Sequence, residues 1–372
     1  MALPFQINPA LHDLPFYQPG RPIEEVAREM GLPPAEIIKL ASNENPLGPS
    51  PKAVAAMKNV LENLNLYPDG NAFYLKQKLA AKLHLDPPNL ILGNGSNEII
   101  EFVGHALLKT GVDVVVSQYC FAVYPLVTKL FNANLITVPA RNYGHNLPAI
   151  LKAITPQTGV IFIANPNNPT GTAVSPAELA RFVQDVPEQV LLVLDEAYIE
   201  FLDDAVDFLP LIRGGQKSNL LLMRTFSKIY GLAGLRVGYG IGIPELVSVL
   251  EKVRQPFNLN SVAQAAALAA LDDAEHVQKT RRNNVSGLQF FSEAFRKMGR
   301  ETIGSAANFI LVRVGDGQGI FEKLQKQGII VRPMGGYQLG EWIRISIGTP
   351  AENKRCLEAL KQLLHKTWDG QS

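Results

Sequence analysis

Short apolar stretches recur along the first two thirds of the chain and alternate with longer segments in which apolar residues have helical spacing. Nearly continuous apolar stretches are typical of strands that are covered on both faces of a sheet, and their alternation with helices is typical of parallel sheets. The pattern therefore predicts an α/β fold with a mainly parallel seven-stranded sheet sandwiched by helices. We expect the strands at residues 89–92, 112–117, 134–138, 159–164, 190–194, 219–224 and 235–241.

Capping signals and periodicity mark the helices. Ser175-Pro-Ala-Glu178 has the residues of a capping box, with proline in the first turn. Leu75, Leu79 and Leu83 recur every four residues, which is the spacing of one helical face. We further expect a helix from Ser50-Pro51 to about residue 64, and a long Ala-rich helical region over 262–298.

The order of elements changes after Pro256. Strands are expected at 307–313, 329–332 and 341–347, with a helix at 317–327 and a final helix capped by Thr349-Pro-Ala-Glu352. This order predicts a smaller α+β domain. We expect three parts: an N-terminal arm and helix that joins the small domain (1–40), a large domain (41–258) and a C-terminal small domain (259–372).

Composition narrows the class of protein. The chain has 372 residues, of which 47% are hydrophobic and 19% charged, and a net charge of +1. A near-neutral chain without a basic helix-turn-helix stretch gives no reason to expect nucleic acid or an anionic membrane as a partner. The two cysteines fit a reducing compartment, and the six histidines show no metal-ligand spacing. With no signal peptide and no long apolar span, we expect a soluble cytoplasmic protein without a metal site.

One lysine follows a strand expected to be buried. Lys228 comes just after the carboxyl end of the strand at 219–224, where open α/β sheets bind their ligands. In a surface loop this amine is simply solvated. In a closed pocket its pKa falls, and it becomes able to form a Schiff base. Thr225, Ser227 and Arg236 supply hydroxyls and a guanidinium that suit a phosphate.

A glycine-rich loop leads into the next candidate anion site. Gly93-Asn-Gly-Ser-Asn-Glu98 follows a strand and opens into an apolar helix. Free backbone N–H groups at such a helix start bind anions, although they also serve plain capping. The loop matches neither the dinucleotide fingerprint nor the Walker loop, which disfavours a nicotinamide dehydrogenase.

Two further strand ends carry polar side chains. The strand at 159–164 leads into Asn165-Pro-Asn-Asn-Pro-Thr-Gly171, and the strand at 190–194 leads into Asp195-Glu-Ala-Tyr198. A strand-end Asp commonly binds a metal or caps a helix, but a buried one can also hold a pyridine nitrogen protonated. A phosphate loop, an amide, a carboxylate, a phenol and a lysine at successive strand ends together supply the contacts that pyridoxal phosphate requires.

At this point the chain resembles the fold-type I, aspartate-aminotransferase-like pyridoxal-phosphate enzymes, and most closely the histidinol-phosphate aminotransferase family. The resemblance covers essentially the whole chain. The motifs that carry it are 40–51 (LASNENPLGPSP), Tyr67-Pro-Asp69, 93–98, 165–171, 195–198, Ser227-Lys228, Leu232-Ala-Gly-Leu-Arg236 and Arg344.

The resemblance implies catalytic roles for Lys228, Asp195 and Tyr198, and cofactor-binding roles for further residues. Lys228 would form the Schiff base with pyridoxal 5'-phosphate and then move the substrate proton. Asp195 would pair with the ring nitrogen, while Asn168 and Tyr198 would hydrogen-bond the ring hydroxyl. Phe121 would stack on the ring. The phosphate would be held by Gly95, Ser96, Asn97, Thr225, Ser227 and Arg236.

The resemblance also implies partners and substrates. Tyr67 would reach the phosphate of the other subunit in a homodimer with shared active sites. Arg344 would bind the substrate carboxylate, with Arg332, Tyr17 and Asn168 nearby. The implied reaction is transamination between L-histidinol phosphate and 2-oxoglutarate in histidine biosynthesis.

Two departures from the family pattern and three rival functions remain open. Asn97 stands where the family usually has Asp, and Tyr119-Cys120 replaces Pro-Thr before Phe121, which leaves the stacking role of Phe121 open. The rivals are an aromatic amino-acid aminotransferase, a threonine-phosphate decarboxylase of the same subfamily, and a non-catalytic pyridoxal-phosphate-binding module.

Overall fold

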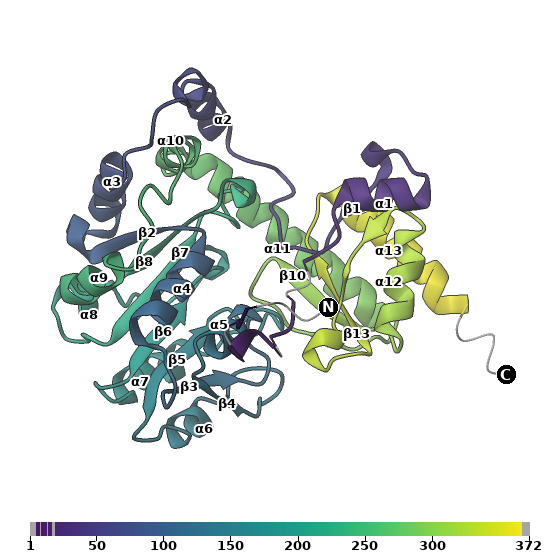
Figure 1. Ribbon diagram of the computed structural model, residues 1–372. Coiled ribbons are helices and arrows are strands. Elements are labelled where there is room, and N and C mark those ends of the chain that lie inside the picture. Colours follow the sequence, from purple (N-terminus) through teal and green to yellow (C-terminus); the bar gives the residue numbers. More distant parts are fainter. Residues whose placement is uncertain (1–4, 8, 13, 17–18, 367–372) are drawn as a thin grey trace.

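The computed structural model describes residues 5–7, 9–12, 14–16 and 19–366. It has two lobes, joined in part by the long helix α11 (Ala274–Lys297), which runs from the larger lobe into the smaller one (Figure 1). Within the described residues, no helix is long and apolar enough to cross a membrane.

The larger lobe is built on a seven-stranded sheet in the order β2-β8-β7-β6-β5-β3-β4. Strand β8 pairs antiparallel with both of its neighbours, and the other pairs are parallel. The predicted α/β class and mainly parallel sheet are confirmed. The strands are β2 (Leu90–Asn94), β3 (Asp113–Ser117), β4 (Asn134–Val138), β5 (Thr158–Ala164), β6 (Leu191–Asp195), β7 (Leu220–Thr225) and β8 (Val237–Ile241).

Helices cover both faces of this sheet because the central strands are apolar on both sides. In β6, Leu192 and Leu194 join one core cluster, whereas Leu191 and Val193 join the cluster on the opposite face. The first face is covered by α3 (Phe73–Leu83), α6 (Leu147–Lys152), α7 (Pro176–Asp185), α8 (Leu209–Arg213) and α10 (Ser261–Ala270). The second face is covered by α4 (Ser96–Leu107), α5 (Val123–Leu130) and α9 (Pro244–Glu251). Helix α2 (Pro51–Lys58) packs on α10.

The smaller lobe has a four-stranded antiparallel sheet in the order β12-β13-β10-β9. A short parallel pair, β1 with β11, ties the N-terminal segment to this lobe, and Val26 and Ala27 of α1 share its core with α11 and α13. Its elements are α1 (Ile23–Met30), β1 (Ile38–Lys39), β9 (Thr302–Ile303), β10 (Phe309–Arg313), α12 (Gly317–Gln325), β11 (Ile329–Ile330), β12 (Arg332–Pro333), β13 (Trp342–Ser346) and α13 (Pro350–Lys366).

Three expected elements are divided or shorter than the sequence pattern predicted. The helical region over 262–298 is two helices, because Asp273 caps α11 by accepting a hydrogen bond from the His276 backbone N–H. The strand expected at 329–332 is divided between β11 and β12, which pair with different partners. The helix from Ser50 ends at Lys58. The domain boundaries stay predictions. Helix α10, which begins after the expected boundary at residue 258, shares the core of the large sheet.

Gly238 closes the contact between β8 and the turn before α4. A Cβ atom at this position would lie 2.6 Å from the Gly95 carbonyl carbon and would clash with the Ser96 backbone nitrogen. We predict that Gly238→Ala lowers the free energy of unfolding by about 1–3 kcal/mol, the usual cost of overpacking, measured by urea denaturation. Gly304→Ala is the matched control, since a Cβ there meets no atom within 4 Å. Equal losses in the two variants would contradict this packing.

Candidate active site

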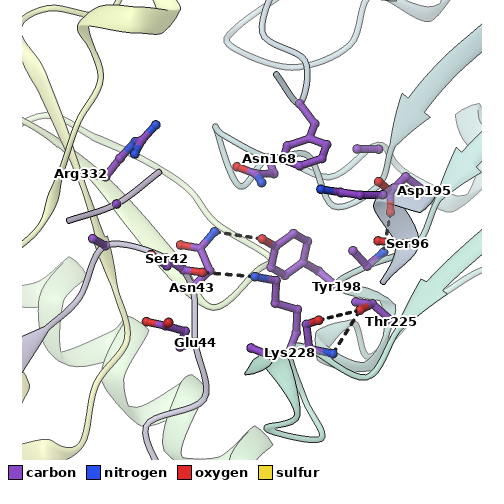
Figure 2. A pocket seen from close by; sticks show the side chains of 18 of the residues that line it. Ser42, Asn43, Glu44, Ser96, Asn168, Asp195, Tyr198, Thr225, Lys228 and Arg332 are labelled. Carbon is purple, nitrogen blue, oxygen red and sulfur yellow. Dashed lines mark hydrogen bonds between the residues drawn. The ribbon is translucent and has the colours of Figure 1, made fainter. Parts of the chain in front are cut away.

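A cavity of about 350 Å³ lies at one edge of the large sheet and is lined from both lobes (Figure 2). Many of its lining residues were predicted from the sequence to be site residues. These are Ser96, Asn97, Phe121, Asn168, Asp195, Tyr198, Thr225, Ser227, Lys228, Arg236, Arg332 and Arg344.

The sheet topology brings these side chains together. Strands β5, β6 and β7 are parallel neighbours, so their carboxyl ends meet at one edge, and Asn168, Asp195 and Lys228 follow them there. Strand β8 runs the opposite way, so the residue before its start, Arg236, lies at the same edge.

One end of the cavity has the features of an anion site. Helix α4 begins at Ser96 after Gly95, whose φ of 81° is readily adopted only by glycine. The Arg236 guanidinium packs against Gly95, where an added Cβ would lie 2.5 Å from Arg236 Nη2. Thr225 Oγ1 accepts the Ser227 backbone N–H at 3.1 Å and lies 3.0 Å from Ser227 Oγ. A helix N-terminus, a guanidinium and two hydroxyls thus converge, as at phosphate sites.

Asp195 is a buried carboxylate held by two donors. Its Oδ2 accepts the phenol proton of Tyr124 at 2.7 Å, and its Oδ1 accepts the Ala197 N–H at 3.1 Å. Burial raises the pKa of Asp195 to about 6, against the opposing effect of these two hydrogen bonds. Tyr124, stacked on Phe162 with ring centroids 4.7 Å apart, was missed by the sequence analysis. Its place in an apolar helix resembled that of any core aromatic residue.

Lys228 has its amine in the same cavity. Its Nζ donates to the Ser42 carbonyl oxygen at 3.2 Å (Figure 2). Burial lowers the pKa of Lys228 to about 8, and the positive charge of Arg344 acts in the same direction, whereas Glu44 opposes it. The amine therefore loses its proton far more readily than an ordinary lysine.

An ion pair joins the strands of Asp195 and Lys228 on the opposite face of the sheet. Arg224 Nε donates to Glu196 Oε2 at 2.7 Å, and the Glu196 carboxylate is 3% exposed. Side chains alternate between the faces of a strand, so Glu196 faces away from the cavity that Asp195 lines. This pair was not predicted from the sequence, because its members are 28 positions apart and nothing in the 195–198 motif indicates that Glu196 pairs with Arg224.

Arg344, from the smaller lobe, is held in the cavity by the side-chain amide of Asn168 from the larger lobe. Arg344 Nη1 donates to Asn168 Oδ1 at 2.7 Å, and Nη2 donates to the Ala41 carbonyl at 2.9 Å. Arg332 lines the cavity from neighbouring strand β12. Asn43, which the sequence analysis did not single out, donates from Nδ2 to the Tyr198 hydroxyl at 2.9 Å.

The remaining expected site residues have different surroundings. The Phe121 ring lines the cavity and lies edge-on to Tyr124, with centroids 5.7 Å apart. Tyr67 is 82% exposed, stacks on Phe257 and does not line this cavity. Tyr17 lies outside the described residues. The roles assigned to all these residues stay predictions. No cluster of three or more potential metal ligands occurs in the described part of the chain.

The lowered pKa of Lys228 has a consequence for stability. Between pH 8 and 10.5 the unfolded lysine binds more protons than the folded one, so this residue makes the fold more stable as the pH rises. We predict that the free energy of unfolding of the apoprotein, relative to that of Lys228→Met, increases by about 2 kcal/mol from pH 8 to pH 10. Urea denaturation of both proteins measures it, and a constant difference would refute the shift.

Comparison with known proteins agrees with this geometry. Residues 35–360 match the model of the family "Aminotransferase class I and II". A histidinol-phosphate aminotransferase of Akkermansia muciniphila is 52% identical over 96% of this chain and 98% of its own, and one of Methylobacillus flagellatus is 51% identical over 94% of each.

A solved structure has the same fold. The histidinol-phosphate aminotransferase of Sinorhizobium meliloti, in complex with pyridoxal-5'-phosphate, superposes with a TM-score of 0.90 at 29% identity, covering 97% of this chain and 98% of its own. The chain therefore belongs to the class I and II aminotransferases, and within them to the histidinol-phosphate aminotransferase group.

Proposed function

We propose that this chain transfers the amino group of L-histidinol phosphate to 2-oxoglutarate, giving imidazole acetol phosphate and L-glutamate, with pyridoxal 5'-phosphate as cofactor. The observation that carries the proposal is the meeting of the Lys228 amine, the Asp195 carboxylate and the anion site of α4 in one cavity. The names of relatives about half identical over nearly the whole chain support the substrate. The step belongs to histidine biosynthesis.

The residues present fit the cofactor. The first turn of α4, Arg236 and the Thr225–Ser227 hydroxyls suit its phosphate, and the space at Gly95 lets the guanidinium approach the helix end. Asp195 is buried and lines the cavity, where a protonated ring nitrogen would neutralise its carboxylate. We assign Phe121 to the ring face and Asn168 and Tyr198 to the ring hydroxyl.

When bound, pyridoxal phosphate supplies an electron-withdrawing ring that stabilises negative charge at the substrate Cα. The chain supplies the proton chemistry. Lys228, with its pKa lowered to about 8, is a general base near neutral pH and can return the proton after accepting it. Asp195 keeps a counter-charge in the cavity, and the buried surroundings of both groups strengthen their interaction.

Two arginines suit the anionic substrates. Arg344, 6% exposed and fixed by Asn168 and Ala41, suits a carboxylate, and Arg332 lines the cavity on the next strand. One substrate has a phosphate and the other has two carboxylates, and guanidinium groups bind both kinds of anion in bidentate fashion. We propose a role in binding a substrate anion for Tyr17 as well, on the family resemblance of the sequence alone.

We propose that the protein works as a cytoplasmic homodimer. Several large apolar side chains near Tyr67 are exposed, and a second copy of the chain would cover them; they include Leu61, Leu64, Leu66, Phe73 and Tyr74. Tyr67 would then reach the phosphate in the partner's site. The two cysteines, both buried and free, fit a reducing compartment.

The test is an amino-transfer assay with the purified protein, L-histidinol phosphate and 2-oxoglutarate, measuring glutamate. We predict turnover, and a fall in kcat of at least about 100-fold in Lys228→Ala, because a positioned general base contributes about 10²–10⁴-fold. Lys217→Ala is the matched control, since Lys217 is also buried but donates to the Val186 carbonyl, outside the cavity.

Parallel assays separate the rival functions. Faster turnover of phenylalanine than of histidinol phosphate would favour an aromatic aminotransferase. Release of carbon dioxide from threonine phosphate would favour a decarboxylase. Cofactor binding without turnover of any of these amines would favour a non-catalytic binding protein.

A further inference from the structure

Asn43 connects the two lobes at the wall of the cavity. It lies in the loop after β1, is 2% exposed and has a φ of 56°. This left-handed conformation is uncommon for residues other than glycine, and asparagine tolerates it better than most. Strain of this kind persists where surrounding contacts fix the residue, and it is concentrated at functional sites.

The contacts of Asn43 with Ser346, at the end of β13, fix the orientation of its amide. The Asn43 backbone N–H donates to Ser346 Oγ at 2.8 Å, so the serine oxygen is an acceptor there. The single hydroxyl proton of Ser346 is then donated to Asn43 Oδ1 at 3.0 Å. Because Oδ1 faces Ser346, the amide nitrogen Nδ2 must face the other way, toward Tyr198.

This orientation determines what the Tyr198 hydroxyl can do. An amide nitrogen only donates, so the Tyr198 oxygen accepts from Asn43 Nδ2 at 2.9 Å (Figure 2). The phenol has one proton, and it must point away from Asn43. No acceptor for this proton is found in the described part of the chain, and Tyr198 lines the cavity.

Charged or titratable groups on several elements lie near the same phenol. Arg344 lies on β13 and Tyr337 in the loop before it, while Asp195 ends β6, and each influences the pKa of Tyr198. The Lys228 amine lies 5.7 Å from the centre of the Tyr198 ring. Burial raises the pKa of Tyr198 to about 12, so the hydroxyl keeps its proton near neutral pH.

We propose that Asn43 and Ser346 are positioning residues that direct the Tyr198 O–H into the cavity, where it donates to the ring oxygen of pyridoxal phosphate. The proposal rests on the proposed function. It adds two residues to the site. Asn43, in the loop after β1, donates to the Tyr198 oxygen, and Ser346, at the end of β13, fixes the orientation of the Asn43 amide. The phenol is thereby held as a donor toward the ligand and as an acceptor toward the protein.

Asn43→Asp tests the proposal, because it keeps the size and the tolerance of positive φ but removes the donor. A carboxylate accepts the Tyr198 proton and turns it away from the cavity. We expect the affinity of the apoprotein for pyridoxal phosphate, measured by fluorescence titration, to fall about two- to tenfold, the usual effect of one hydrogen bond. The pH midpoint of the bound cofactor's absorbance should rise, since a donor to an anionic oxygen favours the deprotonated form.

Two comparisons separate orientation of the phenol from other effects. In a Tyr198→Phe background, Asn43→Asp should change neither readout further, because residues that act through one group are not additive. Asn308→Asp is the matched control: Asn308 is buried and its Nδ2 donates to the Asn43 carbonyl at 3.0 Å, but it forms no hydrogen bond with the Tyr198 hydroxyl. It should leave both readouts unchanged.

The outcomes are distinguishable. Equal changes in Asn43→Asp and Asn308→Asp, or changes that persist in the Tyr198→Phe background, would overturn the proposal. If Asn43→Asp does not fold, Ser346→Ala decides, since it releases the amide without adding a charge and should weaken binding at least twofold only when Tyr198 is present. Failure of the wild-type apoprotein to bind pyridoxal phosphate would instead refute the proposed function.

Discussion

The candidate active site depends on the burial of one lysine amine at the edge of a parallel sheet. Taking the Lys228 ammonium out of water destabilises its charged form, and the nearby Arg344 adds to this, so the pKa falls to about 8. The buried Asp195 carboxylate has the opposite tendency, with a pKa raised to about 6. Desolvation thus brings the pKa values of both groups closer to neutral pH. In this range Lys228 can exchange a proton, while the Asp195 carboxylate supplies a counter-charge. A more open site would leave both groups with ordinary pKa values and little reactivity.

The sheet holds Asp195 and Lys228 close together through contacts on both of its faces. Asp195 and Lys228 follow adjacent parallel strands, and the Arg224–Glu196 ion pair joins the same two strands on the far face. A buried ion pair is weak evidence for stability, but loss of one partner leaves an uncompensated charge. Tyr124 holds the Asp195 carboxylate from α5, and the Asn43 loop contacts both Lys228 and Tyr198. The reactive groups are therefore supported by the sheet, by a covering helix and by the smaller lobe.

Much of this arrangement follows from local sequence pattern. The central strands β5, β6 and β7 are largely apolar stretches, and the polar residues after them must meet at one edge because these strands are parallel, so Asp195, Asn168 and Lys228 could be predicted. Contacts that depend on packing between distant segments could not. Tyr124 resembles a core residue in sequence, and the Arg344–Asn168 bond spans 176 positions. Asn43 lies in a loop dense in turn-forming residues, and nothing there indicates that its amide faces Tyr198. The break before Asp273 was hidden by an Ala-rich stretch that favours helix on either side.

The central claim is that the buried amine of Lys228 is the group that bonds the cofactor aldehyde. Reductive trapping tests it most directly: the protein is loaded with pyridoxal phosphate, reduced with sodium borohydride and digested, and the modified peptide is sequenced by mass spectrometry. The account predicts a stable phosphopyridoxyl group on Lys228 at near-stoichiometric yield. Modification of a different lysine, with Lys228 unlabelled, would contradict it.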